Sequence, residues 1–276
     1  VHHCMRVADT LSAEGIEAAV LDLLTDAARV PLARLLSEEA LEAVPINALL
    51  TGSRDEAVAQ AAALRGSGYG AAKLKVGGAA PAQHAETVRA VRAALGDAVA
   101  LRLDANRAWG YDDAVAFGRA VESCGIEYIE EPLDDPSRFV NFASATGIPV
   151  ALDETVVECG VDDLDRWRGA KAAVLKPTLL GGLEAAMWFA RRAANLGMTP
   201  VISSSFETGL GLAVLANLAA SAMPEGVAAG LGTHSWLGAD IVDGPFPVAD
   251  GRIDVARAHA LCRTVAVDYG AQGGHA

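Results

Sequence analysis

From residue 46 onward, the sequence alternates between short apolar segments and longer amphipathic or alanine-rich segments. The short segments have the length and composition of β-strands, and the segments between them have the periodicity of helices. Repeated strand–helix alternation produces parallel strands, either in a doubly wound open sheet or in a closed barrel. We predict eight strands, near residues 46–50, 71–76, 99–105, 126–131, 149–154, 172–176, 200–205 and 227–232.

Charged residues within these strands distinguish between the two architectures. Both faces of a doubly wound sheet contact helices, so its strands are apolar throughout. Here one face is apolar, and in strand after strand, from residues 71–76 to residues 200–205, the other face carries charged or hydroxyl groups near the strand's end. Such groups need a shared interior that opens to water, so we predict a closed α/β barrel of the TIM type with its site at the carboxyl ends of the strands. The polar face carries Lys73, Lys75, Arg102, Asp104, Glu130, Asp153, Lys176, Ser203 and Ser205.

Composition excludes several classes of partner. The formal net charge of -13 argues against nucleic acid, because phosphates need a basic surface. The most apolar run, residues 210–222, is too short and too rich in Gly and Ala to span a membrane. Four scattered cysteines without a CxxC pair, and no recognisable signal peptide, suit a cytoplasmic protein. We expect a small-molecule partner and neither membrane nor nucleic acid; the sequence leaves the oligomeric state open.

Three acidic residues, Asp104, Glu130 and Asp153, end three consecutive predicted strands. Each alone could be a helix N-cap. Three in succession, with lysines on flanking strands, are better explained as ligands of Mg²⁺, which accepts carboxylate oxygens and which Mn²⁺ can replace. Glu131 follows Glu130 but points the other way by strand alternation, so we predict Glu130 as the ligand.

Lysines flank these acids on both sides along the barrel wall. Lys73 and Lys75 share one face of a strand at positions i and i+2, and Lys176 ends a strand on the other side of the acids. The two neighbouring ammonium charges disfavour protonation of both lysines, which suits a proton acceptor. A carboxylate held beside a metal can lose its α-proton to such a lysine, because the metal stabilises the enediolate. The pattern predicts acid–base chemistry on a small-molecule carboxylate.

Seven motifs resemble those of the enolase superfamily and occur in the same order along the chain. Within the superfamily they resemble the muconate-lactonizing-enzyme-like subgroup and, in that subgroup, the o-succinylbenzoate synthase family. The resemblance covers most of the chain from Pro45 to about residue 242 and implies a (β/α)7β barrel with an enolase-like α+β cap domain. The motifs are KLKVG (73–77), LRLDANRAW (101–109), IEEP (129–132), LDET (152–155), VLKPTLLGGLE (174–184), VISSSFETGLGL (201–212) and AGLGT (229–233).

The resemblance also implies a domain organisation. Residues 1–43 would be the helical remainder of the cap, residues 44–242 the barrel with the active site, and residues 243–276 a segment that returns to the cap. Family members begin with a cap-domain sheet, whereas this sequence begins at the helical part of the cap. We therefore expect a shortened cap, weaker substrate binding and an exposed apolar surface.

The resemblance implies roles for individual residues as well. Mg²⁺ would bind Asp104, Glu130 and Asp153, and Lys75, supported by Lys73, would be the acid–base residue. Lys176 would stabilise the enediolate from the other side of the substrate. Asn106, Ser203 and Gly230 are expected to contact the substrate, with a position behind the metal ligands as the alternative for Asn106. Arg102 and Glu131 are expected to support the metal ligands. His234 is expected either at the substrate or on the polar rim.

The implied reaction is that of a carbon–oxygen lyase of menaquinone biosynthesis. It is the Mg²⁺-dependent syn-dehydration of 2-succinyl-6-hydroxy-2,4-cyclohexadiene-1-carboxylate to o-succinylbenzoate. An N-succinylamino acid racemase or a dipeptide epimerase would use the same lysines, although the last strand has no DxD motif to support the epimerase. A non-catalytic metal-binding barrel would keep the acids without turnover. Schiff-base chemistry at Lys176 is disfavoured by the acids around it.

Overall fold

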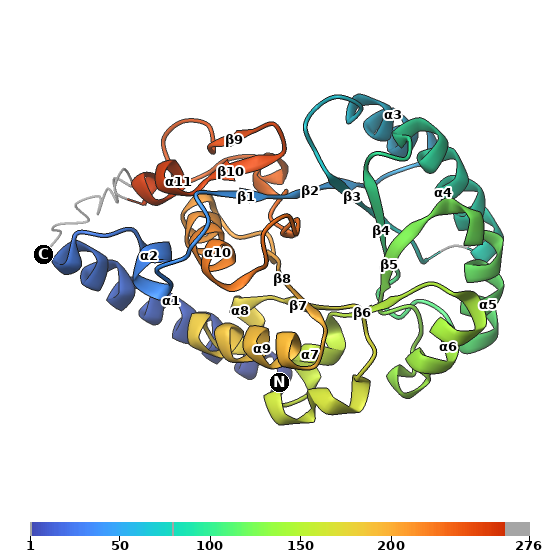
Figure 1. The fold of residues 1–276 in the computed structure, drawn as a ribbon, viewed down its shortest axis with the longest axis horizontal. Helices are drawn as coiled ribbons and strands as arrows, with labels where there is room; N and C mark the ends of the chain where they lie inside the picture. Colours follow the sequence, from blue (N-terminus) through green and yellow to red (C-terminus); the bar gives the residue numbers. More distant parts are fainter. Residues whose placement is uncertain (1, 79, 263–276) are drawn as a thin grey trace, which may run out of the picture.

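A parallel sheet forms the centre of the computed structural model, which describes residues 2–78 and 80–262 and their side chains from residue 14. Its seven strands follow the order β2-β3-β4-β5-β6-β7-β8 and curl into a barrel (Figure 1). Each adjacent pair is parallel, as the alternating sequence predicts. The strands are β2 (Asn47–Leu50), β3 (Ala71–Lys75), β4 (Ala100–Asp104), β5 (Ile126–Glu130), β6 (Val150–Leu152), β7 (Ala172–Leu175) and β8 (Thr199–Ile202).

Two residues, rather than a full eighth strand, close the barrel. Ala229 forms a parallel bridge with Ile46, and Gly230 forms one with Ser203. The eighth predicted strand, residues 227–232, is therefore longer than the paired segment. The amide of Val227 donates to the carbonyl of Pro224 in a turn, so only the middle of the segment lies alongside its neighbours. A Cβ at Gly230 would lie 2.3 Å from Oγ of Ser203, so glycine permits this close approach.

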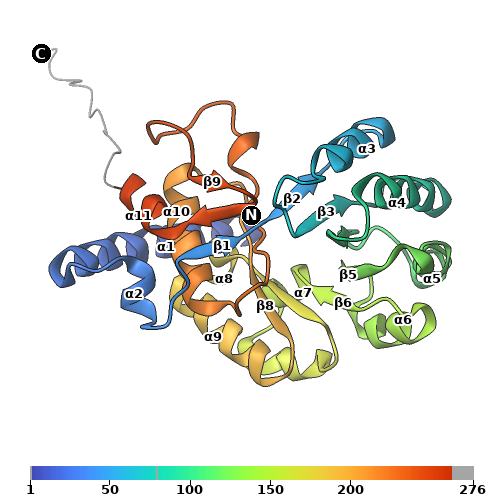
Figure 2. The ribbon, with the colours of Figure 1, turned by 45° about the horizontal axis from the view of Figure 1, so that its top comes forward.

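Helices cover the outside of the barrel and bury the apolar faces of the strands. Figure 2 shows α3, α4, α5 and α6 following one another around β2 to β6. Leu101, Leu103 and Ile129 are fully buried in the core, as the alternation of strand faces predicts. A capping box between Ser53 and Glu56 begins α3. The helices are α3 (Arg54–Ala63), α4 (Pro81–Leu95), α5 (Tyr111–Ala120), α6 (Phe139–Thr146), α7 (Glu154–Glu158), α8 (Pro177–Leu180), α9 (Leu183–Asn195) and α10 (Gly209–Ala222).

Beside the barrel, the segment before β2 pairs with the segment that follows the barrel. In an antiparallel three-stranded sheet, Val44 pairs with Ile253. Residues 263–276 of the predicted C-terminal segment lie outside the described residues. Across residues 2–78 and 80–262, no helix combines the length and apolar character needed to cross a membrane. The elements outside the barrel are α1 (His2–Ala28), α2 (Leu32–Leu36), β1 (Ala43–Pro45), β9 (Val248–Ala249), β10 (Arg252–Asp254) and α11 (Val255–Leu261).

Helix α1 contacts the barrel on one side and is exposed on another. It lies beside α8 and α9 (Figure 1). Ile16 and Leu23 on this helix are 68% and 70% exposed, and Val20 and Leu24 are also exposed. These positions, at i, i+4, i+7 and i+8, form one apolar stripe. Helix α1 therefore carries an exposed apolar stripe.

A carboxylate from α1 caps α9. Oε2 of Glu17 accepts a hydrogen bond from the amide of Leu183 at 2.6 Å, and Oε1 accepts one from the amide of Glu184 at 2.8 Å. The N-cap residue of α9 is Gly182, which has no side chain to accept these bonds. Glu17 satisfies otherwise unpaired amides and complements the positive end of the helix dipole. The contact therefore fastens α1 to the barrel.

We expect Glu17→Ala to lower the free energy of unfolding by about 1 kcal/mol, the typical cost of losing a helix cap. Urea titration followed by circular dichroism measures this change. Asp22→Ala on the exposed part of the same helix is the matched control. Equal losses in the two variants would show that the cap itself contributes nothing.

Glu14 on α1 gives the stability of the protein a pH dependence. Burial, followed by the charges of Glu207 and Glu17, raises the pKa of Glu14 from 4.5 to about 7. The folded state therefore keeps a proton that the unfolded chain has already lost. The resulting stabilisation is full below pH 4.5 and is lost as the pH rises through about 7.

We expect Glu14→Gln to remove this component, so that the variant loses less stability than the wild type between pH 4.5 and pH 7. Urea midpoints measured across this range test the prediction. Parallel curves for the two proteins would contradict it.

Candidate active site

The three predicted acids converge at the carboxyl ends of β4, β5 and β6. Asp104 and Glu130 are directly paired in the β4–β5 register, and Asp153 follows the last residue of β6. One carboxylate oxygen from each lies within 4.8 Å of the others. Their exposed fractions are 0%, 2% and 1%, so all three charges are removed from solvent.

Helix capping does not explain Asp153. This residue occupies the N-cap position of α7, but its side chain accepts no capping hydrogen bond. Oδ2 instead accepts a hydrogen bond from Nζ of Lys176 at 2.6 Å. The carboxylate therefore faces the interior of the barrel with the other two acids.

The three predicted lysines reach this acidic row from both sides. Nζ of Lys73 lies 3.1 Å from Oδ2 of Asp104 and 2.9 Å from Oε2 of Glu130. Nζ of Lys75 lies 2.7 Å from the same Asp104 oxygen. Lys73 is buried, whereas the Lys75 side chain is 42% exposed. Because Lys75 lies on β3 and Lys176 follows β7, the two ammonium groups approach from opposite ends of the row.

The electrostatics of the acids follow from burial and from these lysines. Burial raises the pKa of Glu130 to about 8, with Lys73 opposing the shift and the charges of Asp104 and Asp153 adding to it. Burial alone would raise the pKa of Asp104, but the charges of Lys73 and Lys75 lower it to about 2. Burial would lower the pKa of Lys73, yet its carboxylate partners raise it overall.

The donor set fits a divalent metal ion. Three buried carboxylates meet in one site, where Lys73, Lys75 and Lys176 contact them from both sides. All the donors are carboxylate oxygens, which hard divalent cations prefer. Asp104, Glu130 and Asp153 are the residues that would hold the metal.

A cavity of about 290 Å³ opens beside the lysines at the mouth of the barrel. Lys73, Lys75 and Lys176 line it together with Ser203 and Gly230. Oγ of Ser203 donates to the carbonyl of Gly230 at 3.3 Å. The rest of the lining consists of Asn47, Leu49, Leu179, Ser204, Ser205, Phe206, Gly232 and Thr233.

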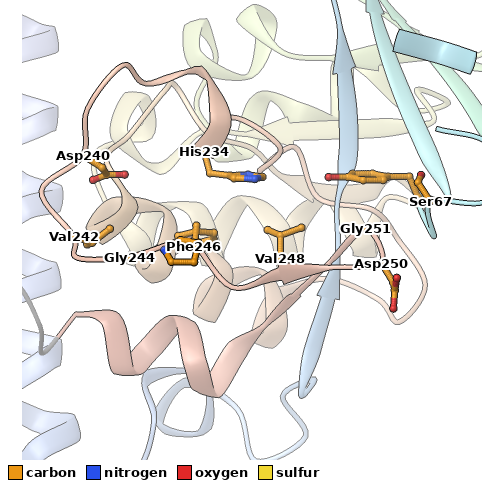
Figure 3. Close-up of a pocket in the computed structure, with 11 residues that line it drawn as sticks. Ser67, His234, Asp240, Val242, Gly244, Phe246, Val248, Asp250 and Gly251 are labelled. Atoms are coloured by element: carbon orange, nitrogen blue, oxygen red, sulfur yellow. The ribbon is translucent and has the colours of Figure 1, made fainter. Parts of the chain in front are cut away.

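A larger cavity, of about 510 Å³, lies apart from the acids and lysines (Figure 3). His234 lines it, with its ring stacked on Phe246 at a centroid separation of 5.9 Å. Burial lowers the pKa of His234. Since His234 is not part of the lining of the barrel-mouth cavity, the structure favours the rim position over the substrate contact. The smaller cavity, which contains the reactive groups, is the candidate active site.

The remaining predicted residues have different surroundings. Asn106 accepts a hydrogen bond from Nζ of Lys75 at 2.8 Å and donates one to Glu154 at 2.9 Å, so it orients the lysine. Arg102 donates to Glu127 at 2.6 Å and to the carbonyl of Ala228 at 2.7 Å. Arg102 therefore ties β4 to the segment that closes the barrel, and its hydrogen bonds do not reach the three acids.

Several site residues were not predicted from the sequence. Asn47 and Leu49 line the cavity from β2, and strand alternation from Asn47 could have identified both. Arg107 joins Glu131 at 2.7 Å behind the acids, and its place in the LRLDANRAW motif is the signal that could have drawn attention to it. Thr233, which shares a hydrogen bond with Ser204, ends the AGLGT motif, and its place there is the corresponding signal.

The barrel and its row of acids and lysines define an enolase-type active site, and comparison with known proteins agrees. Residues 56–261 match the family described as Enolase C-terminal domain-like. The chain belongs to the enolase superfamily. Its sequence is similar to that of o-succinylbenzoate synthase from Thermobifida fusca (strain YX), with 37% identity over 222 residues, 78% of this chain and 68% of that protein. The predicted family resemblance is confirmed.

Two other matches describe the extent of the similarity. Protein PHYLLO, chloroplastic, from Arabidopsis thaliana is 40% identical over 195 residues, which are 63% of this chain and 11% of that much longer protein. The crystal structure of muconate lactonizing enzyme from Pseudomonas fluorescens complexed with muconolactone has a TM-score of 0.82 at 27% identity, and the match covers 90% of this chain and 68% of that one. The chain thus spans a small part of the first protein and about two thirds of the second.

Proposed function

We propose that this chain catalyses the Mg²⁺-dependent syn-dehydration of 2-succinyl-6-hydroxy-2,4-cyclohexadiene-1-carboxylate to o-succinylbenzoate. One observation carries the proposal: the ammonium groups of Lys75 and Lys176 reach one row of buried carboxylates from opposite sides, beside a cavity of about 290 Å³. Similarity to o-succinylbenzoate synthase supports this substrate over other carboxylates.

Lys75 is the proposed acid–base residue. It is the more exposed of the two lysines on β3, and it lines the cavity. As an unprotonated amine, Lys75 takes the α-proton of the substrate, and it then returns a proton to the departing hydroxide on the same face, which gives the syn geometry. Asn106 orients its Nζ at 2.8 Å and is a partner other than the metal-site carboxylates.

Charge stabilisation comes from the rest of the site. Asp104, Glu130 and Asp153 would hold Mg²⁺, or Mn²⁺ in its place, and the bound ion would supply positive charge beside the substrate carboxylate. The Lys176 ammonium adds positive charge from the opposite side, where negative charge develops as the proton leaves. Lys73 stays bound between Asp104 and Glu130 and holds both carboxylates in place.

The cavity walls suggest how the substrate is held. Ser203, Ser204 and Ser205 line the cavity, and hydroxyl groups suit the succinyl carboxylate as hydrogen-bond donors. Leu179 and Phe206 offer apolar surface to the ring.

We also propose a domain division, in which residues 44–242 form the barrel and residues 1–43 and 243–276 form the cap portion.

A spectroscopic assay with the purified chain tests the proposal. We expect Mg²⁺-dependent formation of o-succinylbenzoate from the cyclohexadiene acid, and loss of that activity in excess EDTA. Rapid α-proton exchange of an N-succinylamino acid in D₂O, without any dehydration, would instead indicate a racemase. Mn²⁺ binding with neither reaction would indicate a non-catalytic barrel.

A further inference from the structure

Behind the metal-site acids, a second set of polar contacts joins the carboxyl ends of the same three strands. Its centre is the guanidinium of Arg107, which follows β4. Nε donates to Oε2 of Glu131 at 2.7 Å, and Nη2 donates to Oγ1 of Thr155 at 3.0 Å. Both terminal nitrogens also donate to Glu158, at 2.7 and 2.9 Å. We call these four residues the Arg107 clasp.

Glu131 connects the clasp to a predicted metal ligand. Its side chain is completely buried. Oε1 accepts hydrogen bonds from the amides of Asp153, at 2.8 Å, and Thr155, at 3.0 Å. Oε2 accepts a third from the hydroxyl of Thr155 at 2.9 Å. The backbone that carries Asp153 is thus held by a carboxylate whose counter-charge is Arg107.

The clasp contacts all three ligand-bearing strand ends. Arg107 lies three residues after Asp104, and Glu131 lies directly after Glu130. The amide of Arg107 also donates to the carbonyl of Glu131 at 2.8 Å. Together with the Asp153 contact, these bonds connect the backbone at each of the three acids.

The backbone at these positions is strained. Arg107 and Glu131 have φ angles of 58° and 42°, and neighbouring Asn106 has a φ of 44°. The left-handed region is uncommon for residues other than glycine, and such conformations persist only where surrounding contacts hold them. The clasp supplies those contacts, because it ties the side chains of Arg107 and Glu131 to each other and to α7.

Three carboxylates within 4.8 Å repel one another, so their convergence requires a rigid support. Groups that orient metal ligands from behind change metal affinity by about 10- to 100-fold when they are removed. We propose that Arg107 is a positioning residue of the metal site, which acts through Glu131 to fix Asp153 and the ends of β4, β5 and β6. This inference rests on the proposed metal-dependent function but concerns metal affinity rather than turnover.

Binding of Mn²⁺ to the purified chain without substrate, followed by electron paramagnetic resonance, tests the role of Arg107. Arg107→Lys keeps the positive charge but loses the planar fork that reaches Glu131, Thr155 and Glu158 together. We expect it to weaken Mn²⁺ binding about 10-fold or more. Arg166→Ala, which removes an exposed ion pair with Asp163, is the matched control and should bind Mn²⁺ like the wild type.

Two results would overturn the inference. The first is an Arg107→Lys protein that is less stable but binds Mn²⁺ with wild-type affinity, because the clasp would then be purely structural. The second applies if Arg107→Lys does not fold. Glu158→Gln changes only the exposed end of the clasp, and we expect it to weaken Mn²⁺ binding. Wild-type Mn²⁺ affinity in this variant would refute the positioning role of Arg107. A wild-type chain that binds Mn²⁺ but does not dehydrate the substrate would refute the proposed function and leave the clasp intact.

Discussion

Lys75→Ala is expected to reduce kcat for the dehydration by about 10³-fold, within the usual range for loss of a general acid–base residue. In the proposed mechanism this side chain both removes the α-proton and delivers a proton to the leaving hydroxide, so one substitution impairs two steps. No other ammonium occupies its place, because Lys73 is bound between Asp104 and Glu130 and Lys176 contacts Asp153.

Steady-state kinetics at saturating Mg²⁺ measures this effect, and Mn²⁺ binding establishes that the metal site survives. Lys171→Ala is the matched control, since Lys171 is exposed and lies outside the cavity lining. A Lys75→Ala enzyme with more than a tenth of the wild-type kcat would exclude Lys75 as the acid–base residue.

Lys73→Met is expected to lower the free energy of unfolding of the metal-free protein by about 3–5 kcal/mol, the cost of removing one partner from a buried ion pair. The Lys73 ammonium lies about equally close to Asp104 and Glu130, and its loss leaves their charges buried without this counter-ion. A divalent metal bound by the same acids should restore most of the lost stability, because it supplies the missing positive charge.

Urea unfolding in EDTA and in excess Mg²⁺ distinguishes the two situations. Lys171→Met, which makes the same substitution at an exposed position, should change stability little in either condition. An equal loss for Lys73→Met with and without Mg²⁺ would mean that Lys73 contributes packing rather than charge.

Strand alternation explains why so much of the site could be predicted. A residue's position along a parallel strand determines both its face and its level in the barrel, so Lys75, Asp104 and Glu130 were predictable as neighbours. The observed registers pair Lys75 with Asp104 and Asp104 with Glu130. The positions of the metal-site acids and of the lysines around them are therefore the part of the structure that the sequence pattern predicts best.

The prediction was weaker where local backbone geometry departs from that alternation. Arg102 was expected as a supporting residue behind the acids, but its side chain pairs with Glu127 and donates to the carbonyl of Ala228. The partners of Arg107 lie on other strand ends, far away in the sequence, so no local pattern indicates them. Left-handed residues such as Glu131 break the alternation on which the prediction depends.

The short closure of the barrel has a consequence for the way it assembles and fluctuates. Asn47 and Ala229 come from opposite ends of the barrel sequence, so their pairing must wait until the intervening strands are in place. The closing seam, formed by the bridges of Ala229 and Gly230, contains few backbone hydrogen bonds, so it should be the first part of the sheet to open. Its amides should exchange with deuterium before those of β4 and β5. Since Ser203 and Gly230 belong both to this seam and to the cavity wall, each opening would transiently widen the substrate's compartment.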